Sequence, residues 1–177
     1  LIRHEKKLTP SYETIPLSLQ LQQDGLLSLM RFKSSSLASF KDLTTFHSGG
    51  TARHVMFCEN EHDVRDTVLF AKENAFAWYV LGEGSNVLAR ETGFDGVILR
   101  MVSKGVTYLS HEDSTIVRAQ AGVSWNEFVD EVTMKELWGA ENLAGIPGTV
   151  GAAPVQNIGA YGVELADIFF SAQVYDA

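Results

Sequence analysis

The chain has 177 residues and a mass of 19.5 kDa, which is enough for one domain or for two small lobes. Apolar residues make up 45% of it and charged residues 20%, a balance that excludes a disordered tail, a collagen and a low-complexity linker. The formal net charge of −8 argues against a general nucleic-acid-binding protein, because neutralising phosphates requires a basic surface.

Residues 1–42 differ in character from the rest of the chain. Leucine and glutamine dominate residues 17–23, and the serine run at 34–36 is typical of a linker. We therefore expect a poorly ordered N-terminal extension over residues 1–42. The alternative is a short helix that packs on the body of the protein or on a partner. The charged residues at the start of the chain interrupt any apolar run, so no signal peptide is visible.

The next part of the chain predicts a strand, a helix and two further strands. Residues 54–58 form an apolar run typical of a buried strand, and Asn60 can cap a helix that ends near residues 72–74. Residues 78–81 and 96–100 have the composition of short strands. The helical crossover is long enough to join parallel strands, so we expect a strand–helix–strand unit.

A hairpin and a second helix follow. Residues 106–109 and 115–119 alternate as strands do, with a polar turn between them. Ser124 and Glu127 have the spacing of a capping box, which predicts a helix that ends near residues 137–139. Further on, residues 168–175 are apolar and aromatic enough to predict a final strand.

The first segment that could carry chemistry is Gly-Glu-Gly-Ser-Asn at residues 82–86, directly after a predicted strand. Glycines let backbone N–H groups approach an anion closely, and Ser85 and Asn86 add polar side chains. The segment is neither a Walker A loop nor a dinucleotide-binding fingerprint, since no lysine follows and Val87 stands at the third glycine position. A plain tight turn and a phosphate-binding loop both remain open.

The second such segment covers residues 141–164 and is rich in glycine, alanine and proline. A flat ligand can lie against such a surface, with Gln156, Asn157 and Tyr161 as its fixed polar groups. We favour this ligand-lining role over an inert buried connection, because long irregular loops in compact domains are usually functional. Residues 142–163 carry no charged side chain, but their many helix breakers argue against a membrane-spanning helix.

The other candidates for chemistry are weak. The five histidines do not have the spacing of metal ligands, so we assign no metal site and no catalytic residue. Cys58 is the single cysteine, which excludes an intrachain disulfide and is typical of the reducing cytoplasm, where we expect the protein. Its apolar strand predicts an inert, buried thiol. Glu83 and Glu164 could touch a ligand, although a solvated carboxylate is the default interpretation.

Taken together, several motifs resemble the UDP-N-acetylenolpyruvoylglucosamine reductases over residues 43–177. Thr-Thr-Phe at 44–46 and Gly-Gly-Thr-Ala at 49–52 are similar to the family's opening pattern, with Thr44 in place of the usual asparagine. Residues 82–86 resemble its pyrophosphate loop. Ala-Gly at 121–122, with a tryptophan three positions on, resembles its strand-to-helix turn, and residues 141–164 resemble its flavin-facing segment.

The resemblance implies an α+β fold, the two-lobed FAD-binding domain of the vanillyl-alcohol-oxidase (PCMH) type, here truncated at its C-terminal side. Lobe 1 would cover residues 43–100, and lobe 2 would cover residues 101–177 and be incomplete, with FAD held between them. In this interpretation the cofactor-binding residues are Gly82, Glu83, Gly84, Ser85, Asn86, Ile146, Pro147, Gly148, Gly151, Ala152, Ala153, Gln156, Asn157, Ile158, Gly159 and Tyr161. Some relatives carry serines at the positions of Ala152 and Ala153, so we expect binding of the ring without a side-chain hydrogen bond from these two positions.

In this family, NADPH reduces the flavin, which passes hydride to the enolpyruvyl group of UDP-N-acetylglucosamine enolpyruvate. The product is UDP-N-acetylmuramate for peptidoglycan synthesis, and so for cell wall biogenesis, cell shape and cell division. The family's proton-donating serine, its arginine and its glutamate lie downstream of the motifs seen here, as does the substrate domain. The resemblance therefore implies a chain that is inactive alone and binds the UDP-sugar only together with that missing part.

Two rival interpretations remain. One is a non-catalytic module that binds FAD or another nucleotide. The other is a different flavin oxidase of the same fold. The second is weaker, because many such oxidases attach FAD through a histidine, and neither glycine-rich segment contains one.

Overall fold

The computed structural model describes residues 34–111 and 114–176, which belong to one compact unit, Lys33–Ala177. Most of the expected N-terminal extension lies outside the described residues. Its last part differs from the expectation: the serine run forms β1 (Ser34–Ser39), followed by the short helix α2 (Phe40–Leu43). A strand forms here because β1 pairs antiparallel with the next strand through its backbone, which does not require apolar side chains.

A four-stranded sheet carries the first half of the described chain. It contains β2 (Thr51–Cys58), β3 (Ala77–Leu81) and β4 (Phe94–Met101), in the order β1-β2-β4-β3. All three strands predicted in this region are confirmed. β2 and β3 both run parallel to β4, which lies between them. The strand–helix–strand unit therefore exists, but its two strands are not neighbours, because the apolar β4 takes the buried central position.

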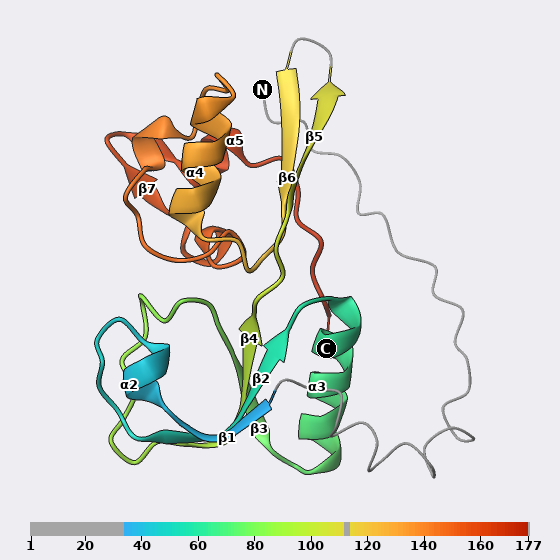
Figure 1. Ribbon diagram of the computed structural model, residues 1–177, viewed down its shortest axis with the longest axis vertical. Helices are drawn as coiled ribbons and strands as arrows, with labels where there is room; N and C mark the ends of the chain where they lie inside the picture. Colours follow the sequence, from blue (N-terminus) through green and yellow to red (C-terminus); the bar gives the residue numbers. More distant parts are fainter. Residues whose placement is uncertain (1–33, 112–113, 177) are drawn as a thin grey trace, which may run out of the picture. The chain divides into compact units, whose positions relative to one another are not determined.

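The predicted helix between β2 and β3 is α3 (Glu61–Glu73), which Figure 1 shows alongside these strands in green. Asn60 caps it as expected: its side chain accepts a hydrogen bond from the Asp63 N–H (3.1 Å), and the Asp63 carboxylate accepts one from the Asn60 N–H (3.3 Å). α3 buries Val68 against one face of the sheet, in a cluster with Leu99. The other face packs on α2.

The predicted hairpin is confirmed as β5 (Val106–His111) and β6 (Ser114–Ala119), which pair antiparallel. The following helix, α4 (Trp125–Met134), begins where expected but ends before residues 137–139. The capping box that predicted it is wrong, since the Ser124 side chain makes no cap hydrogen bond. Instead, the backbone of Ser124 pairs with Thr149 in an isolated antiparallel bridge.

Short elements complete the described chain. They are the 3-10 helices η2 (Glu141–Leu143) and η3 (Ala153–Gln156), the strands β7 (Gly159–Ala160) and β8 (Val163–Glu164), and helix α5 (Leu165–Ile168). The predicted final strand is wrong, because residues 169–176 form neither helix nor strand and pair with no strand of the described chain. The large side chains of Phe170 and Val174 are 71% and 81% exposed.

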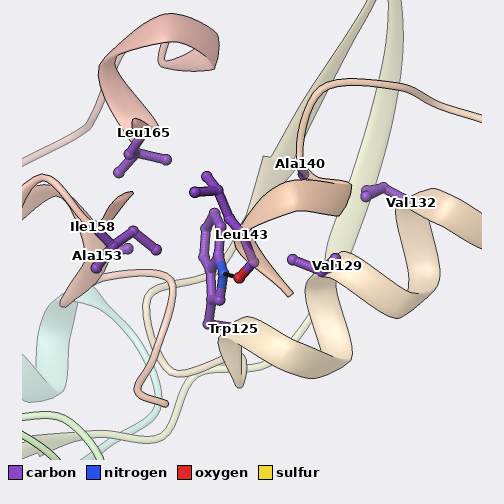
Figure 2. Close-up of a cluster of buried hydrophobic side chains, with 8 residues drawn as sticks. All are labelled: Trp125, Val129, Val132, Ala140, Leu143, Ala153, Ile158 and Leu165. Atoms are coloured by element: carbon purple, nitrogen blue, oxygen red, sulfur yellow. Dashed lines mark hydrogen bonds between the residues drawn. The ribbon is translucent and has the colours of Figure 1, made fainter. Parts of the chain in front are cut away.

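A second hydrophobic core lies beneath these short elements, and Figure 2 shows its side chains converging on the indole of Trp125. Its buried members are Trp125, Val129, Val132, Ala140, Leu143, Ala153, Ile158 and Leu165. The core of the sheet and this second core are distinct clusters. Among the described residues, no helix is long and apolar enough to cross a membrane.

Candidate functional site

The two glycine-rich segments that the sequence singled out lie against each other in the structure. Three hydrogen bonds join them across more than sixty positions of sequence. The Ser85 hydroxyl donates to the carbonyl of Pro147 (3.3 Å), and the N–H of Gly148 donates to Oε2 of Glu83 (3.2 Å). In addition, the Asn86 side-chain amide donates to Oε1 of Gln156 (2.6 Å). The structure therefore brings both candidate segments into one site.

Close approach of the backbone makes this junction possible. A Cβ atom on Gly82 would lie 3.0 Å from Oγ1 of Thr149 and 3.4 Å from Cβ of Ala152. A larger side chain at this position would push the two segments apart. Gly84 serves a different contact: it has φ +74°, and a Cβ there would overlap the carbonyl of Leu43 at the end of α2.

Several backbone N–H groups in the loop after β3 have no hydrogen-bond acceptor within the described chain. Within the described chain, the N–H groups of Glu83, Gly84, Ser85 and Asn86 donate to no acceptor. Unpaired N–H groups on successive residues of a glycine-containing loop are the usual protein ligands of phosphate groups. Neither segment contains a lysine, arginine or histidine, so an anion bound here would be held by backbone amides. This arrangement fits the phosphate-binding alternative better than the plain tight turn.

The N-terminus of α4 fixes the shape of the second segment. The indole Nε1 of Trp125 donates to the carbonyl of Leu143 (2.8 Å), which Figure 2 marks with a dashed line. The side-chain oxygen of Asn126 accepts from the N–H of Gly145 (2.7 Å), and the backbone N–H of Trp125 donates to the carbonyl of Gly148 (2.8 Å). These bonds hold the irregular segment in one conformation although it contains little regular secondary structure.

The strand-to-helix turn before α4 supports the same segment. The N–H of Gly151 donates to the carbonyl of Ala121 (2.9 Å), and a Cβ on Gly151 would lie 2.6 Å from Cβ of Ala121. Gly122 is equally crowded, since a Cβ there would lie 2.6 Å from the backbone nitrogen of Ser103. Small residues at these positions allow the turn to pack directly against the glycine-rich segment.

The remaining residues of the predicted site are spread over different surroundings. Ala153 and Ile158 are buried in the second core, and Ile146 is partly buried against it. Asn157 is tied to its own neighbourhood, because its side-chain amide donates to Glu164 (2.7 Å). Gly159 lies in β7, and Tyr161 is 89% exposed. None of these residues takes part in the three hydrogen bonds that join the two segments, in contrast to Pro147, Gly148 and Gln156.

Sequence reasoning missed Thr149, whose side chain lies next to Gly82. The residue is only 5% exposed, yet its hydroxyl makes no hydrogen bond with the described residues. Since no buried side-chain oxygen or nitrogen among the described residues lacks a partner, this hydroxyl must keep contact with solvent. Its place between the glycines of the second segment was the available signal.

The histidines and the cysteine were the other candidates for chemistry. Within the described residues, no group of histidine, cysteine, aspartate and glutamate side chains could hold a metal ion. Cys58 is fully buried at the end of β2, and burial raises the pKa of its thiol to about 11. The expected burial of Cys58 is therefore confirmed, and its low reactivity at neutral pH stays a prediction.

Comparison with known proteins agrees with this geometry. Residues 52–177 match the family model described as the FAD binding domain. The chain is 44% identical over 139 residues to a UDP-N-acetylenolpyruvoylglucosamine reductase of Pseudomonas aeruginosa, covering 78% of this chain and 41% of that protein. It is 38% identical over 143 residues to a reductase of the same name from Saccharopolyspora erythraea, covering 80% and 38%.

The chain is also similar to a solved structure of a reductase of this kind. The crystal structure of UDP-N-acetylenolpyruvylglucosamine reductase from Thermus caldophilus matches with a TM-score of 0.55 and 27% sequence identity, covering 77% of this chain and 46% of that one. The chain spans about two fifths of the length of the curated relatives it matches. The expected fold and the resemblance are thereby confirmed. The chain belongs to the FAD-binding domain family, and it is similar to the FAD-binding part of the UDP-N-acetylenolpyruvoylglucosamine reductases.

Proposed function

We propose that this chain forms the FAD-binding part of a reductase that acts on UDP-N-acetylglucosamine enolpyruvate in peptidoglycan synthesis. In this proposal, FAD lies between a first lobe at residues 43–100 and a second lobe at residues 101–177. The observation that carries the proposal is the junction of the loop at 82–86 with the segment around Gly148. It combines free backbone amides with a surface of small residues, which suits a ligand that is anionic at one end and flat at the other.

Each segment has its own task in this site. The amides of residues 83–86 would hold the pyrophosphate, which explains how an acidic protein can bind it without a lysine. The segment from Pro147 to Ala152 would form the wall against which the flavin ring lies. The hydroxyl of Thr149 lies at the meeting point of both segments and makes no hydrogen bond within the described chain, so it would be available as a further donor.

When bound, FAD would supply hydride-transfer chemistry, with NADPH as the proposed reductant and the enolpyruvyl group as the proposed acceptor. This chain's own residues bind and orient the cofactor and exclude water from one side of it. We assign to them neither the proton donor of the reaction nor the UDP-sugar site. We therefore expect the 177-residue chain to bind FAD without reducing the enolpyruvyl substrate. We propose that the reaction takes place in the cytoplasm.

An FAD titration of the purified chain tests the proposal, with flavin fluorescence and the visible spectrum as readouts. We expect saturable binding of one FAD with a structured shift of the visible bands. Gly82→Val should abolish that binding while leaving the circular dichroism spectrum unchanged, because the added side chain meets Thr149 and Ala152 at the junction. Leu88→Val, at a position that is 75% exposed, is the matched control. A folded chain that binds no FAD would contradict the proposal.

A further inference from the structure

The three hydrogen bonds between the glycine-rich segments form what we call the clasp: Glu83 to Gly148, Ser85 to Pro147 and Asn86 to Gln156. The bonds of Ser85 and Asn86 lie at exposed positions, whereas the bond between Glu83 and Gly148 is partly buried. A hydrogen bond that is shielded from water contributes more than an exposed one, because water competes less for its donor and its acceptor. The bond of Glu83 is therefore the principal member of the clasp.

The charge of Glu83 is at odds with direct anion binding. Its carboxylate sits within a loop whose neighbouring N–H groups are unpaired, and no lysine or arginine of the described chain forms a salt bridge with it. A negative charge at this point repels a pyrophosphate group. The role of this carboxylate is therefore not to bind the anion. The structure shows another role, since Oε2 of Glu83 accepts a hydrogen bond from the N–H of Gly148.

Gly148 connects the start of α4 with the loop at residues 82–86. It has φ +128°, a backbone conformation that favours glycine, and its carbonyl accepts from the backbone N–H of Trp125 at the start of α4. The hydrogen bonds thus run from α4 through Gly148 to Glu83, which follows β3 directly. This path connects the element that shapes the second segment with the loop of the first.

We propose that Glu83 is a positioning residue, which fixes the segment around Gly148 against the loop at 82–86 before any ligand binds. Its consequence for FAD rests on the proposed function: the site is pre-organised, so less ordering accompanies binding. The carboxylate acts as a hydrogen-bond acceptor, and its charge is not required. Glutamine can therefore replace it, whereas alanine cannot.

The first test uses the FAD-free chain and amide hydrogen exchange read by NMR. Glu83→Ala should speed exchange of the Gly148 amide by about tenfold or more, because the amide loses its acceptor. Glu83→Gln should change it by less than about threefold, since the side-chain oxygen can still accept. Glu131→Ala is the matched control, as it removes a carboxylate that accepts from the Tyr108 hydroxyl elsewhere. Unchanged exchange in Glu83→Ala would overturn the proposal.

The second test measures FAD affinity in the same variants. Glu83→Ala should weaken binding by about tenfold, and Glu83→Gln should bind as tightly as the unaltered chain or more tightly. If both variants weaken binding equally, the charge of Glu83 matters and the proposal is wrong. If the unaltered chain binds no FAD, the proposed function fails, while the exchange experiment still decides the clasp on its own.

A double-mutant cycle tests the exposed pair. Asn86→Ala and Gln156→Ala each remove one partner of the amide–amide bond. If that bond is part of the clasp, the double variant should weaken FAD binding no more than either single variant does. Strictly additive losses would mean that the two side chains act separately on the ligand, and they would overturn this part of the proposal.

Discussion

The indole nitrogen of Trp125 donates a hydrogen bond of 2.8 Å to the carbonyl of Leu143, inside the second core. Both residues are buried, Trp125 at 2% exposure and Leu143 at 0%. One side chain thus fills the centre of the core and satisfies a backbone carbonyl of the segment that leads into the candidate site. The stability of this half of the protein and the shape of its glycine-rich segment depend on the same residue.

Replacing Trp125 should therefore be costly even when the replacement is aromatic. Trp125→Phe leaves the Leu143 carbonyl without its partner and removes part of the ring volume, so we expect a loss of about 2–4 kcal/mol in the free energy of unfolding. Urea denaturation followed by circular dichroism measures it. Trp138→Phe is the control, because Trp138 is 89% exposed and should cost less than about 0.5 kcal/mol. Equal effects of the two variants would contradict this account.

The core of the sheet should be equally sensitive at its central strand. Leu99 in β4 is 2% exposed and packs with Val68 of α3. We expect Leu99→Ala to destabilise the protein by about 2–5 kcal/mol, since truncation leaves a cavity in a close-packed region. Leu88→Ala, at a position with 75% exposure, is the matched control for denaturation measurements. A loss below about 1 kcal/mol at Leu99 would mean that this region is loosely packed.

A histidine beneath α3 predicts a dependence of stability on pH. The ring of His54 packs against the rings of Phe70 and Phe76, with centroid distances of 5.5 Å and 5.3 Å. Burial, together with the neighbouring Arg53 charge, lowers the pKa of His54 below its ordinary value of 6.5. The folded state therefore binds this proton less readily than the unfolded state does. The resulting contribution to stability is fully present above pH 6.5 and is lost as the pH falls towards the lowered pKa.

The pH prediction can be isolated with one variant. His54→Phe removes the titrating imidazole but keeps an aromatic ring against Phe70 and Phe76. We expect the free energy of unfolding of this variant to fall less between pH 7 and pH 5 than that of the unaltered chain. The two chains differ only at this position, so the difference between the two curves reports His54. Parallel curves would show that His54 does not contribute.

The reactivity of Cys58 tests whether the contact between β2 and α3 opens in solution. Its thiol is 0% exposed, and burial raises its pKa to about 11. We expect no measurable reaction with Ellman's reagent at pH 8 in the folded chain and complete reaction in urea. Reaction of the folded chain at the rate of a free thiol would show that the contact between β2 and α3 is open in solution.

The sequence predicts well those elements that local signals define. α3 is marked by a capping residue and a regular apolar face, and β2 and β4 by apolar runs. The predictions from sequence are wrong where the local structure depends on residues that are distant in the chain. β1 forms on a serine-rich stretch because β2 offers it a backbone edge. Ser124 stands at the N-cap of α4, but its side chain makes no capping hydrogen bond, and its backbone pairs with the distant Thr149 instead.

In the candidate site, too, local features could be predicted from the sequence and contacts between distant residues could not. Glycine content identified both segments, because close backbone approach requires residues without side chains. Their mutual contact was not predictable, since nothing in the local sequence links Glu83 to Gly148, 65 positions later. Thr149 was overlooked for a related reason: its role depends on lying next to Gly82, which only the folded chain shows.

The most direct test of the central claim is an NMR titration of the isotopically labelled chain with FAD, following each backbone amide. We predict saturating shifts concentrated in the amides of residues 83–86 and in the segment from Gly148 to Ala152, with little change in α3. Such a pattern would place the cofactor at the junction of the two glycine-rich segments. Saturable FAD binding whose shifts lie elsewhere, or a folded chain without shifts, would contradict the account.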